Sequence, residues 1–493
     1  MNPAQRSFIL VLILALAAAN SCQSPQSKVF LVLNFDVEDY TTPASEGIDE
    51  IPKWLAEIMS EEGVTGTFFV IGEKARSLES RGRGDVIAAM AKHDIGSHTN
   101  HGSIHPTITE QLEKSGWEEG VRLMAEQESA GIKDLERIFG VPVKILGRHG
   151  GSYGPQLVCT LGRMGAGYSG SPVSLPGRDV VWFCNALNFT TQYDGFDDTY
   201  HRDDLFGPRF EKLKEDLPKL AKEAAVLSFF AGHPTKIRAE QFWDFNYYRG
   251  RNPGPDEWKT PELRPLESMK TAQANFRRMV RYLKSRDDIE ITTFRSMMEV
   301  YGRQKEVITK DELREIASKV IESRAILGSE YFSPAEAFAG LAGAISEYRT
   351  KGSLPPEIKA ERPLGPAEMA EDRPEISRVY LREVYELAGA ALDLVCQTGA
   401  LPSSLEVRGS RIGAGPLFAL FSAVYLDMIS KKPASEYVAP AFDPYPRTNE
   451  NEIVQAVRDL KSWPVHRPDL DMKKIVELTK LQLWTLKPAH RRG

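Results

Sequence analysis

The pattern of apolar and polar positions divides the chain into two parts. Between residues 28 and 302, short apolar runs alternate with segments of helical apolar spacing. Runs typical of strands covered on both faces occur at 29–35, 66–71, 143–146, 180–183, 226–230 and 289–291. Helical spacing predicts helices at 51–59, 86–92, 117–138, 209–223 and 266–284. This alternation favours a parallel sheet or an α/β barrel, in which functional residues gather at the carboxyl ends of the strands.

The pattern changes after residue 302. Helical periodicity dominates residues 303–493 and predicts a mainly α-helical C-terminal domain. A segment rich in proline and charge, 355–374, predicts a linker or long loop. A helix followed by Gly-x-Leu-Pro occurs twice, ending at 352–355 and 399–402. We therefore expect two repeats, at about 308–356 and 380–430. A chance match of one short tetrad is the alternative interpretation.

The N-terminus has the pattern of an export signal. Arg6 precedes an apolar run at 8–19, which is too short for a comfortable membrane span. Residues 1–22 are therefore expected to be a signal peptide or lipoprotein signal. Cys22 is a candidate lipid-anchored residue, with simple cleavage nearby as the alternative. The expected location is the periplasm or the cell surface.

Length and composition narrow the function classes. A chain of 493 residues is too long for one ordinary domain, and 42% hydrophobic residues exclude a disordered chain. The formal net charge is -6 with both signs mixed and no basic stripe, so no nucleic-acid partner is expected.

Three carboxylates stand where the first predicted strand should end. They are Asp36, Glu38 and Asp39, and strand alternation places Asp36 and Glu38 on one face. Carboxylates this close repel one another unless a cation holds one of them and another serves as a base. A solvated turn or a helix cap is the alternative interpretation.

A histidine cluster follows the carboxylates. His98, His101 and His105 lie within eight residues, and His101 and His105 have the i, i+4 spacing that shares a helix face. Histidine combined with carboxylate suits zinc or a similar first-row metal. Surface or capping histidines are the alternative.

Two further residues are candidates for acid–base chemistry. Arg148 opens a glycine-rich stretch, where its guanidinium could orient a carboxylate, although an ordinary surface arginine is equally compatible with the sequence. His233 follows the apolar run at 226–230 and could be a general acid or a satisfied core residue.

Taken in order, these stretches resemble the polysaccharide deacetylase family, carbohydrate esterase family 4. The matching stretches are Asn-Phe-Asp-Val-Glu-Asp at 34–39, Ile-Gly-Ser-His at 95–98 with His-Pro at 105–106, Arg-His-Gly-Gly at 148–151, and the apolar strand ending at His233. The resemblance covers about residues 28–302 and implies a distorted (β/α) barrel with fewer than eight strands. It also implies a divalent metal, expected to be Zn²⁺.

The resemblance also implies roles for the candidate residues. Asp36 would be the base, held by Arg148, and His233 would protonate the leaving amine. The metal ligands would come from Glu38 or Asp39 and from His98, His101 and His105. The sequence departs from the family pattern at two points. First, Gly102 occupies the place of a second histidine four residues after His98. Second, an aspartate that orients the last histidine has no clear match, with Asp194, Asp197 and Asp198 as candidates.

The Gly102 departure leaves three arrangements open. His101 and His105 form the pair, or His98 and His105 bind across an insertion, or the site has lost a ligand.

The function expected from these features is removal of N-acetyl groups from a cell-surface or environmental polysaccharide by an exported, metal-dependent hydrolase. The stretch 388–428 also resembles a pseudomurein-binding repeat, which implies cell-wall glycan binding by the C-terminal domain. The alternatives are a hydrolase of another non-peptide C–N bond in a small amide, and a glycan-binding protein that has lost its catalytic metal.

Overall fold

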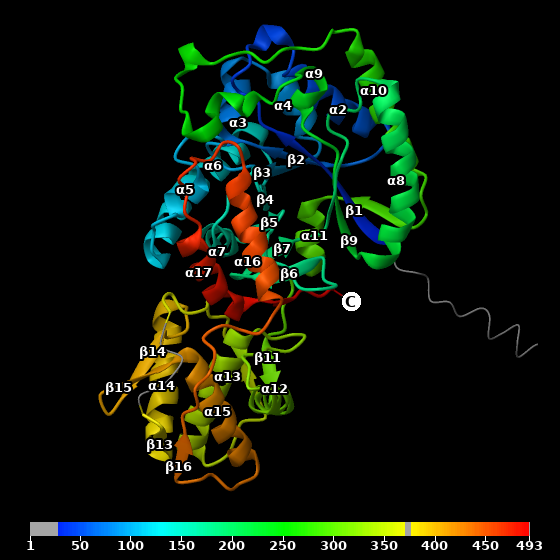
Figure 1. Ribbon diagram of the computed structural model, residues 1–493. Helices are drawn as coiled ribbons and strands as arrows, with labels where there is room; N and C mark the ends of the chain where they lie inside the picture. The colour runs from blue at the N-terminus through cyan, green and yellow to red at the C-terminus, as the bar shows by residue number, and fades with distance from the viewer. Residues whose placement is uncertain (1–27, 370–375, 493) are drawn as a thin grey trace, which may run out of the picture.

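The computed structural model describes residues 28–369 and 376–492. Residues 28–302 contribute most strands of a curled, mainly parallel sheet and the helices that surround it (Figure 1). The strand order is β17-β6-β7-β5-β4-β3-β2-β1-β9-β8, with β10 pairing to β1. The expected distorted (β/α) barrel is therefore confirmed. The expectation of fewer than eight strands is not confirmed, because pairing unites eleven strands in this sheet.

Each strand and helix predicted between residues 28 and 302 is present, and the structure adds short strands and helices that were not predicted. The strands are β1 (Val29–Val37), β2 (Thr67–Val70), β3 (Asp94–Ser97), β4 (Ile145–Gly147), β5 (Gly167–Ser169), β6 (Val180–Phe183), β7 (Ala186–Phe189), β8 (Gln192–Tyr193), β9 (Val226–Phe230) and β10 (Ile289–Thr292). The α-helices are α2 (Glu50–Glu61), α3 (Gly72–Ser80), α4 (Gly84–Met90), α5 (Ile108–Leu112), α6 (Trp117–Phe139), α7 (Pro155–Arg163), α8 (Asp203–Glu223), α9 (Pro234–Arg238), α10 (Ser268–Lys284) and α11 (Phe294–Tyr301). Short 3₁₀ helices are η1 (Ala44–Glu46), η2 (Trp243–Gly250) and η3 (Pro255–Glu257).

Strand β1 lies at the centre of the barrel. It pairs with β9 along 30–34, with β10 along 29–32 and with β2 along 34–37, all in parallel. Both faces of β1 are covered, which explains its continuous apolar run and leaves Asp36 as its one residue that is not fully buried. The segment after Val37 therefore emerges among the carboxyl ends of neighbouring strands.

A helical module follows the barrel. Its helices are α12 (Lys310–Ser323), α13 (Pro334–Lys351), α14 (Leu381–Thr398) and α15 (Ala414–Ile429). Its two-stranded sheets pair β11 (Val307–Thr309) with β12 (Glu357–Lys359), β13 (Arg378–Tyr380) with β16 (Glu436–Val438), and β14 (Ser404–Val407) with β15 (Ser410–Gly413). Both Gly-x-Leu-Pro tetrads follow a helix end, where Gly352 and Gly399 adopt φ of 69°. Their N–H groups bond to the carbonyls of Tyr348 and Val395.

The end of the chain returns to the barrel (Figure 1). It contains α16 (Glu450–Asp459), η4 (Leu460–Ser462), α17 (Lys473–Gln482), η5 (Leu483–Thr485) and β17 (Lys487–Pro488). Strand β17 pairs with β6, and Val457, Leu470 and Leu478 are buried in the barrel core. The packing thus differs from the division expected at residue 303, because buried side chains of α16 and α17 belong to the barrel core rather than to the core of the helical module.

Two sequence features concern membranes and export. Within 28–369 and 376–492, no helix has both the length and the hydropathy of a membrane-spanning segment. The signal segment expected at 1–22, with Cys22, lies outside the described residues.

Candidate metal and catalytic site

The candidate site lies where four neighbouring strands end. Glu38 follows β1, His98 follows β3, His149 lies two residues after β4, and His233 lies three residues after β9. In the sheet the order is β4-β3-β2-β1-β9, so these four strands are neighbours except that β2 lies between β3 and β1. Parallel strands present their carboxyl ends at one edge, so residues distant in sequence meet there.

Glu38 is the centre of this cluster. Its side chain is buried, and its Oε1 lies 2.8 Å from His98 Nε2 and 3.7 Å from His149 Nε2. Its second oxygen, Oε2, accepts a hydrogen bond of 2.9 Å from the indole N–H of Trp243. A buried carboxylate needs such partners, because desolvation penalises its charge.

The donor set of Glu38, His98 and His149 fits a divalent metal. One ligand atom from each of these buried residues lies within 4.8 Å of the others. The Nδ1 of His98 lies 3.0 Å from the carbonyl oxygen of Gly147, which can only accept. His98 can therefore donate from Nδ1 to this carbonyl, while Nε2 faces Glu38 and donates to it without a metal. A metal placed between them would take the Nε2 lone pair instead.

His149 was not a candidate ligand in the sequence. It stood inside the arginine motif, and nothing in the local sequence distinguishes it from the neighbouring polar residues. Its ring is buried, and its centroid lies 4.9 Å from that of His98. The signal that could have identified it is its place three residues after the predicted strand at 143–146.

A second group of residues, Asp36 and His233, shares Glu38 with the first. His233 Nε2 lies 3.7 Å from Asp36 Oδ2 and 3.7 Å from Glu38 Oε1. Asp197 holds His233 twice, through Nδ1 at 2.6 Å and through the backbone N–H at 2.7 Å. Of the three aspartates considered as orienting residues, the structure thus places Asp197 on the last histidine.

Burial and charge shift the pKa values of this cluster in opposite directions. Burial raises the pKa of Asp36, against the pull of His98 and His233. Burial would also raise the pKa of Glu38, but His149, His233 and His98 outweigh it and hold that pKa well below the usual range. Burial lowers the pKa of His149, whereas Asp197 and Glu38 overcome burial and raise the pKa of His233 to about 10. Asp36 and Glu38 are two residues apart, yet the pKa of Asp36 is raised and that of Glu38 is lowered.

Two glycines allow the strands to approach beneath the site. The ring of Phe69 lies against β3 and β4, where a Cβ on Gly96 would meet it at 2.5 Å and a Cβ on Gly147 at 2.7 Å. A side chain at either position would displace Phe69, which also lines the cleft beside Asp36 and His98.

The backbone conformation and the space at position 102 do not suit a histidine. Its φ is 61°, in the left-handed region that favours glycine. A Cβ at this position would lie 2.8 Å from the side chain of Ile71. A histidine at position 102 would therefore be both strained and obstructed.

The remaining predicted metal ligands lie apart from the cluster. His101 is half exposed and bonds to Glu73 at 2.9 Å. Both nitrogens of His105 are occupied, by Glu110 at 2.7 Å and by the carbonyl oxygen of Tyr247 at 3.0 Å. The structure therefore does not bring these two histidines to the carboxylates.

Asp39 also lies apart, since its carboxylate closes the turn after β1. It accepts hydrogen bonds from the backbone and hydroxyl groups of Thr41 and Thr42 and from the hydroxyl of Thr235. Its oxygens are thereby committed to local structure.

Arg148 lines the same cleft as Asp36 and His233 without pairing to either of them. Its guanidinium donates to the carbonyl oxygens of Gly150 and Gly170, which differs from the expected ion pair with Asp36. These bonds brace the loop that carries His149. Arg148, Asp36, His98 and His233 line a polar cleft of about 200 Å³.

Comparisons with known proteins give similarity at the level of structure. No protein-family profile and no curated protein matches the sequence. A Mycobacterium smegmatis protein provisionally assigned as a polysaccharide deacetylase has 15% identity and a TM-score of 0.36, covering 56% of this chain and 91% of its own. An allantoinase has 13% identity and a TM-score of 0.37, with the same coverage of 56% and 91%. A peptidoglycan N-acetylglucosamine deacetylase has 14% identity and a TM-score of 0.31, covering 55% of this chain and 89% of its own.

Proposed function

We propose that this protein is a metal-dependent hydrolase that removes acetyl groups from an N-acetylated polysaccharide. The observation that carries the proposal is the position of Glu38 between two groups of side chains. Glu38 groups with His98 and His149 and also with Asp36 and His233, and His98 Nε2 lies 3.5 Å from Asp36 Oδ2. A metal-binding half and an acid–base half thus adjoin in one cleft, as amide hydrolysis requires.

In this proposal Glu38, His98 and His149 hold Zn²⁺. A divalent metal bound by them would lower the pKa of a bound water and polarise the amide carbonyl. Asp36 accepts the proton of the attacking water at Oδ2. His233 protonates the leaving amine from Nε2, while Asp197 fixes its ring through Nδ1. Trp243 orients Glu38 and keeps water from its second oxygen.

We also propose that the protein is exported, with Cys22 as a lipid anchor, and that the helical module binds cell-wall glycan. The export proposal rests on the apolar run at 8–19. The glycan-binding proposal rests on the sequence stretch at 388–428.

The test is acetate release from N-acetylated chitooligosaccharides and from peptidoglycan by the zinc-loaded protein. Replacing Asp36 with Asn should abolish acetate release while zinc stays bound. The cleft of about 200 Å³ also fits a small amide, so ammonia release from ureides is measured in parallel. Ammonia release without acetate release would favour the second candidate, a hydrolase of small non-peptide amides. Zinc binding with neither product would contradict both.

A further inference from the structure

A second cavity, of about 330 Å³, lies where the barrel meets the segment that leads to the helical module. Strands β6 and β17 contribute Trp182 and Lys487, and the chain after α11 contributes Arg303 and Lys305. Arg491 lies over the ring of Phe30, near the start of β1, with its guanidinium carbon 4.5 Å from the ring centre. The candidate hydrolase site lies beyond the other end of β1, so the two sites are separate.

The lining of this cavity is strongly basic. Among the residues that the structure describes, it contains six basic side chains and no carboxylate, namely Arg303, Lys305, Lys487, His490, Arg491 and Arg492. Three of them meet carboxylates outside the lining, since Lys305 pairs with Glu312 at 2.6 Å, Lys487 with Glu336 at 2.7 Å and His490 with Glu330 at 3.7 Å. Within 28–369 and 376–492, no carboxylate lies within ion-pairing distance of Arg303, Arg491 or Arg492, which leaves three guanidinium groups for an anion.

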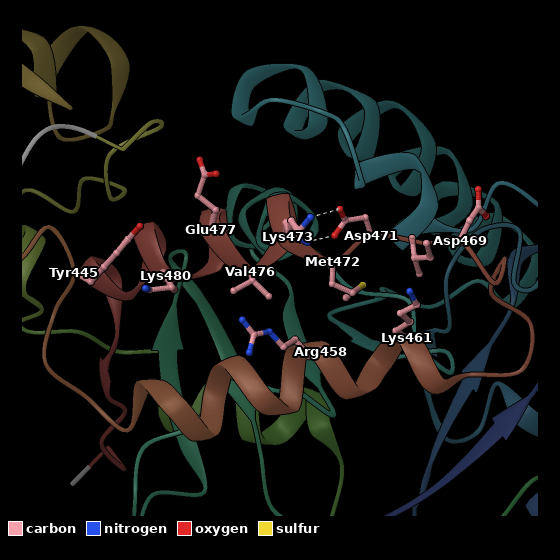
Figure 2. A pocket seen from close by; sticks show the side chains of 11 residues that line it. Tyr445, Arg458, Lys461, Asp469, Asp471, Met472, Lys473, Val476, Glu477 and Lys480 are labelled. Atoms are coloured by element: carbon pink, nitrogen blue, oxygen red, sulfur yellow. Dashed lines mark hydrogen bonds and ion pairs between the residues drawn. The ribbon is translucent and has the colours of Figure 1, made fainter.

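The larger cavity between α16 and α17 shows the contrast (Figure 2). Its volume is about 710 Å³, and its lining mixes cations such as Arg458 with Asp469, Asp471 and Glu477. Lys473 Nζ lies 3.4 Å from Oδ2 of Asp471, two residues earlier in the chain. An anion there would meet carboxylates as well as cations, so charge complementarity favours the smaller cavity.

Two aromatic side chains give the smaller cavity its walls. The ring centres of Tyr331 and His490 lie 4.7 Å apart, and Lys305 Nζ lies 5.8 Å from the centre of the Tyr331 ring. Tyr331 is 48% exposed, and Trp182 also lines the cavity. Arg303, Arg491 and Arg492 are exposed, so their guanidinium groups are accessible to a ligand.

We propose that this cavity binds a phosphate group through Arg303, Arg491 and Arg492. Guanidinium groups bind phosphate oxygens in pairs of parallel hydrogen bonds, which favours phosphate over a weakly bound monovalent ion. The phosphate belongs either to a soluble ester or free phosphate, or to the headgroup of an anionic phospholipid. The proposal is independent of the hydrolase activity, because none of these arginines lies in the catalytic cleft.

The test uses the full chain and two probes. Calorimetry measures binding of inorganic phosphate, and co-sedimentation measures binding to phosphatidylglycerol vesicles against phosphatidylcholine vesicles. The triple variant Arg303→Gln, Arg491→Gln, Arg492→Gln should bind at least about tenfold more weakly, and Arg458→Gln in the larger cavity should bind like the unmodified protein. The single variant Arg303→Gln repeats the test with the Arg491–Phe30 contact intact, in case the triple variant does not fold.

The outcomes separate the two sources of phosphate. Binding of inorganic phosphate alone supports a soluble ligand, and binding of phosphatidylglycerol vesicles supports a lipid headgroup. If neither probe binds, or if the arginine variants bind as tightly as the unmodified protein, the proposal is overturned.

Discussion

Glu38 is the residue on which the proposed hydrolase site depends. Its two oxygens face different partners, His98 at 2.8 Å and the indole N–H of Trp243 at 2.9 Å. Removing one partner of a buried charge leaves the charge uncompensated. The side chains around Glu38 should therefore affect metal affinity or turnover according to their group: His98 and His149 affect metal affinity, and Asp36 and His233 affect turnover.

His149 belongs to the metal-binding side. Replacing His149 with Gln removes an imidazole ligand, so bound zinc, measured by elemental analysis after dialysis, should fall about tenfold or more. His101→Gln is the matched control, because His101 is half exposed and bonds to Glu73. One zinc per chain retained by the His149 variant would show that another residue holds the metal.

Asp197 belongs to the acid–base side. Asp197→Asn weakens the hold on His233 Nδ1, so kcat should fall on the order of a hundredfold with little change in KM or zinc content. Asp194→Asn is the control, since that side chain is exposed on the same segment. Equal effects of the two substitutions would remove the positioning role assigned to Asp197.

Glu128 makes stability depend on pH. It is fully buried in α6, where burial raises its pKa from 4.5 to about 7. The folded protein therefore keeps a proton that the unfolded chain releases, and the free energy of unfolding decreases as pH rises from about 4.5 to about 7, by about 3 kcal/mol. Glu128→Gln should remove this dependence, whereas Glu126→Gln, which is exposed one half-turn away, should keep it. Denaturant titrations between pH 4.5 and 8 measure the effect, and parallel curves for both variants would contradict it.

The residues of the proposed site were predictable from the sequence in part. Asp36, Glu38 and His233 were candidates because they stand at the end of apolar runs, and His98 because it belongs to a histidine cluster. The structure brings all four together. His149 was not identified, and Asp197 was one of three candidates left open, because their meeting with Glu38 and His233 depends on strand order and loop path. His101 and His105 have the spacing of a metal pair, but their segment bonds to Glu73 and Glu110 instead of forming a helix face.

Among the elements, helix α17 has the largest consequence for domain organisation. Its sequence lies within the predicted helical domain, yet Leu478 is fully buried in the barrel core. Strands with long apolar runs, such as β1 and β9, were predicted within two residues of their bounds. Strands β3 and β5 were not predicted, because they are short and contain glycine. Which helix covers which surface depends on three-dimensional packing, so periodicity alone could not place α17.

A core substitution in α17 tests this packing. Leu478→Ala should lower the free energy of unfolding of the barrel by about 2–5 kcal/mol, because it leaves a cavity among barrel side chains. Leu266→Ala, at a side chain that is 63% exposed, is the control. Thermal unfolding followed together with loss of zinc reports on the barrel. A barrel transition unaffected by Leu478→Ala would mean that the C-terminal segment does not stabilise it.

In the whole molecule, the chain end joins the barrel, and the helical module stands between two barrel segments in the sequence (Figure 1). The loop between α16 and α17 reaches the proposed site, where Trp463 lies 5.0 Å from the ring of His149. The C-terminal segment thus covers His149, the proposed metal ligand that the barrel supplies. Metal binding should therefore stabilise the barrel and this C-terminal segment together.

Metal removal tests this coupling. After dialysis against a chelator, acetate release should be lost and the Tm should fall, because the metal binds the folded state and not the unfolded chain. Adding Zn²⁺ should restore both. Full activity in the chelator-treated protein would contradict metal dependence.

The central claim is that Glu38, His98 and His149 hold the catalytic metal. Its most direct test is an anomalous difference map at the zinc edge from crystals of the zinc-loaded protein. We predict one peak among Glu38 Oε1, His98 Nε2 and His149 Nε2, beside Asp36 and His233. A peak between Asp39, His101 and His105, or no peak among the three residues under zinc saturation, would contradict the claim.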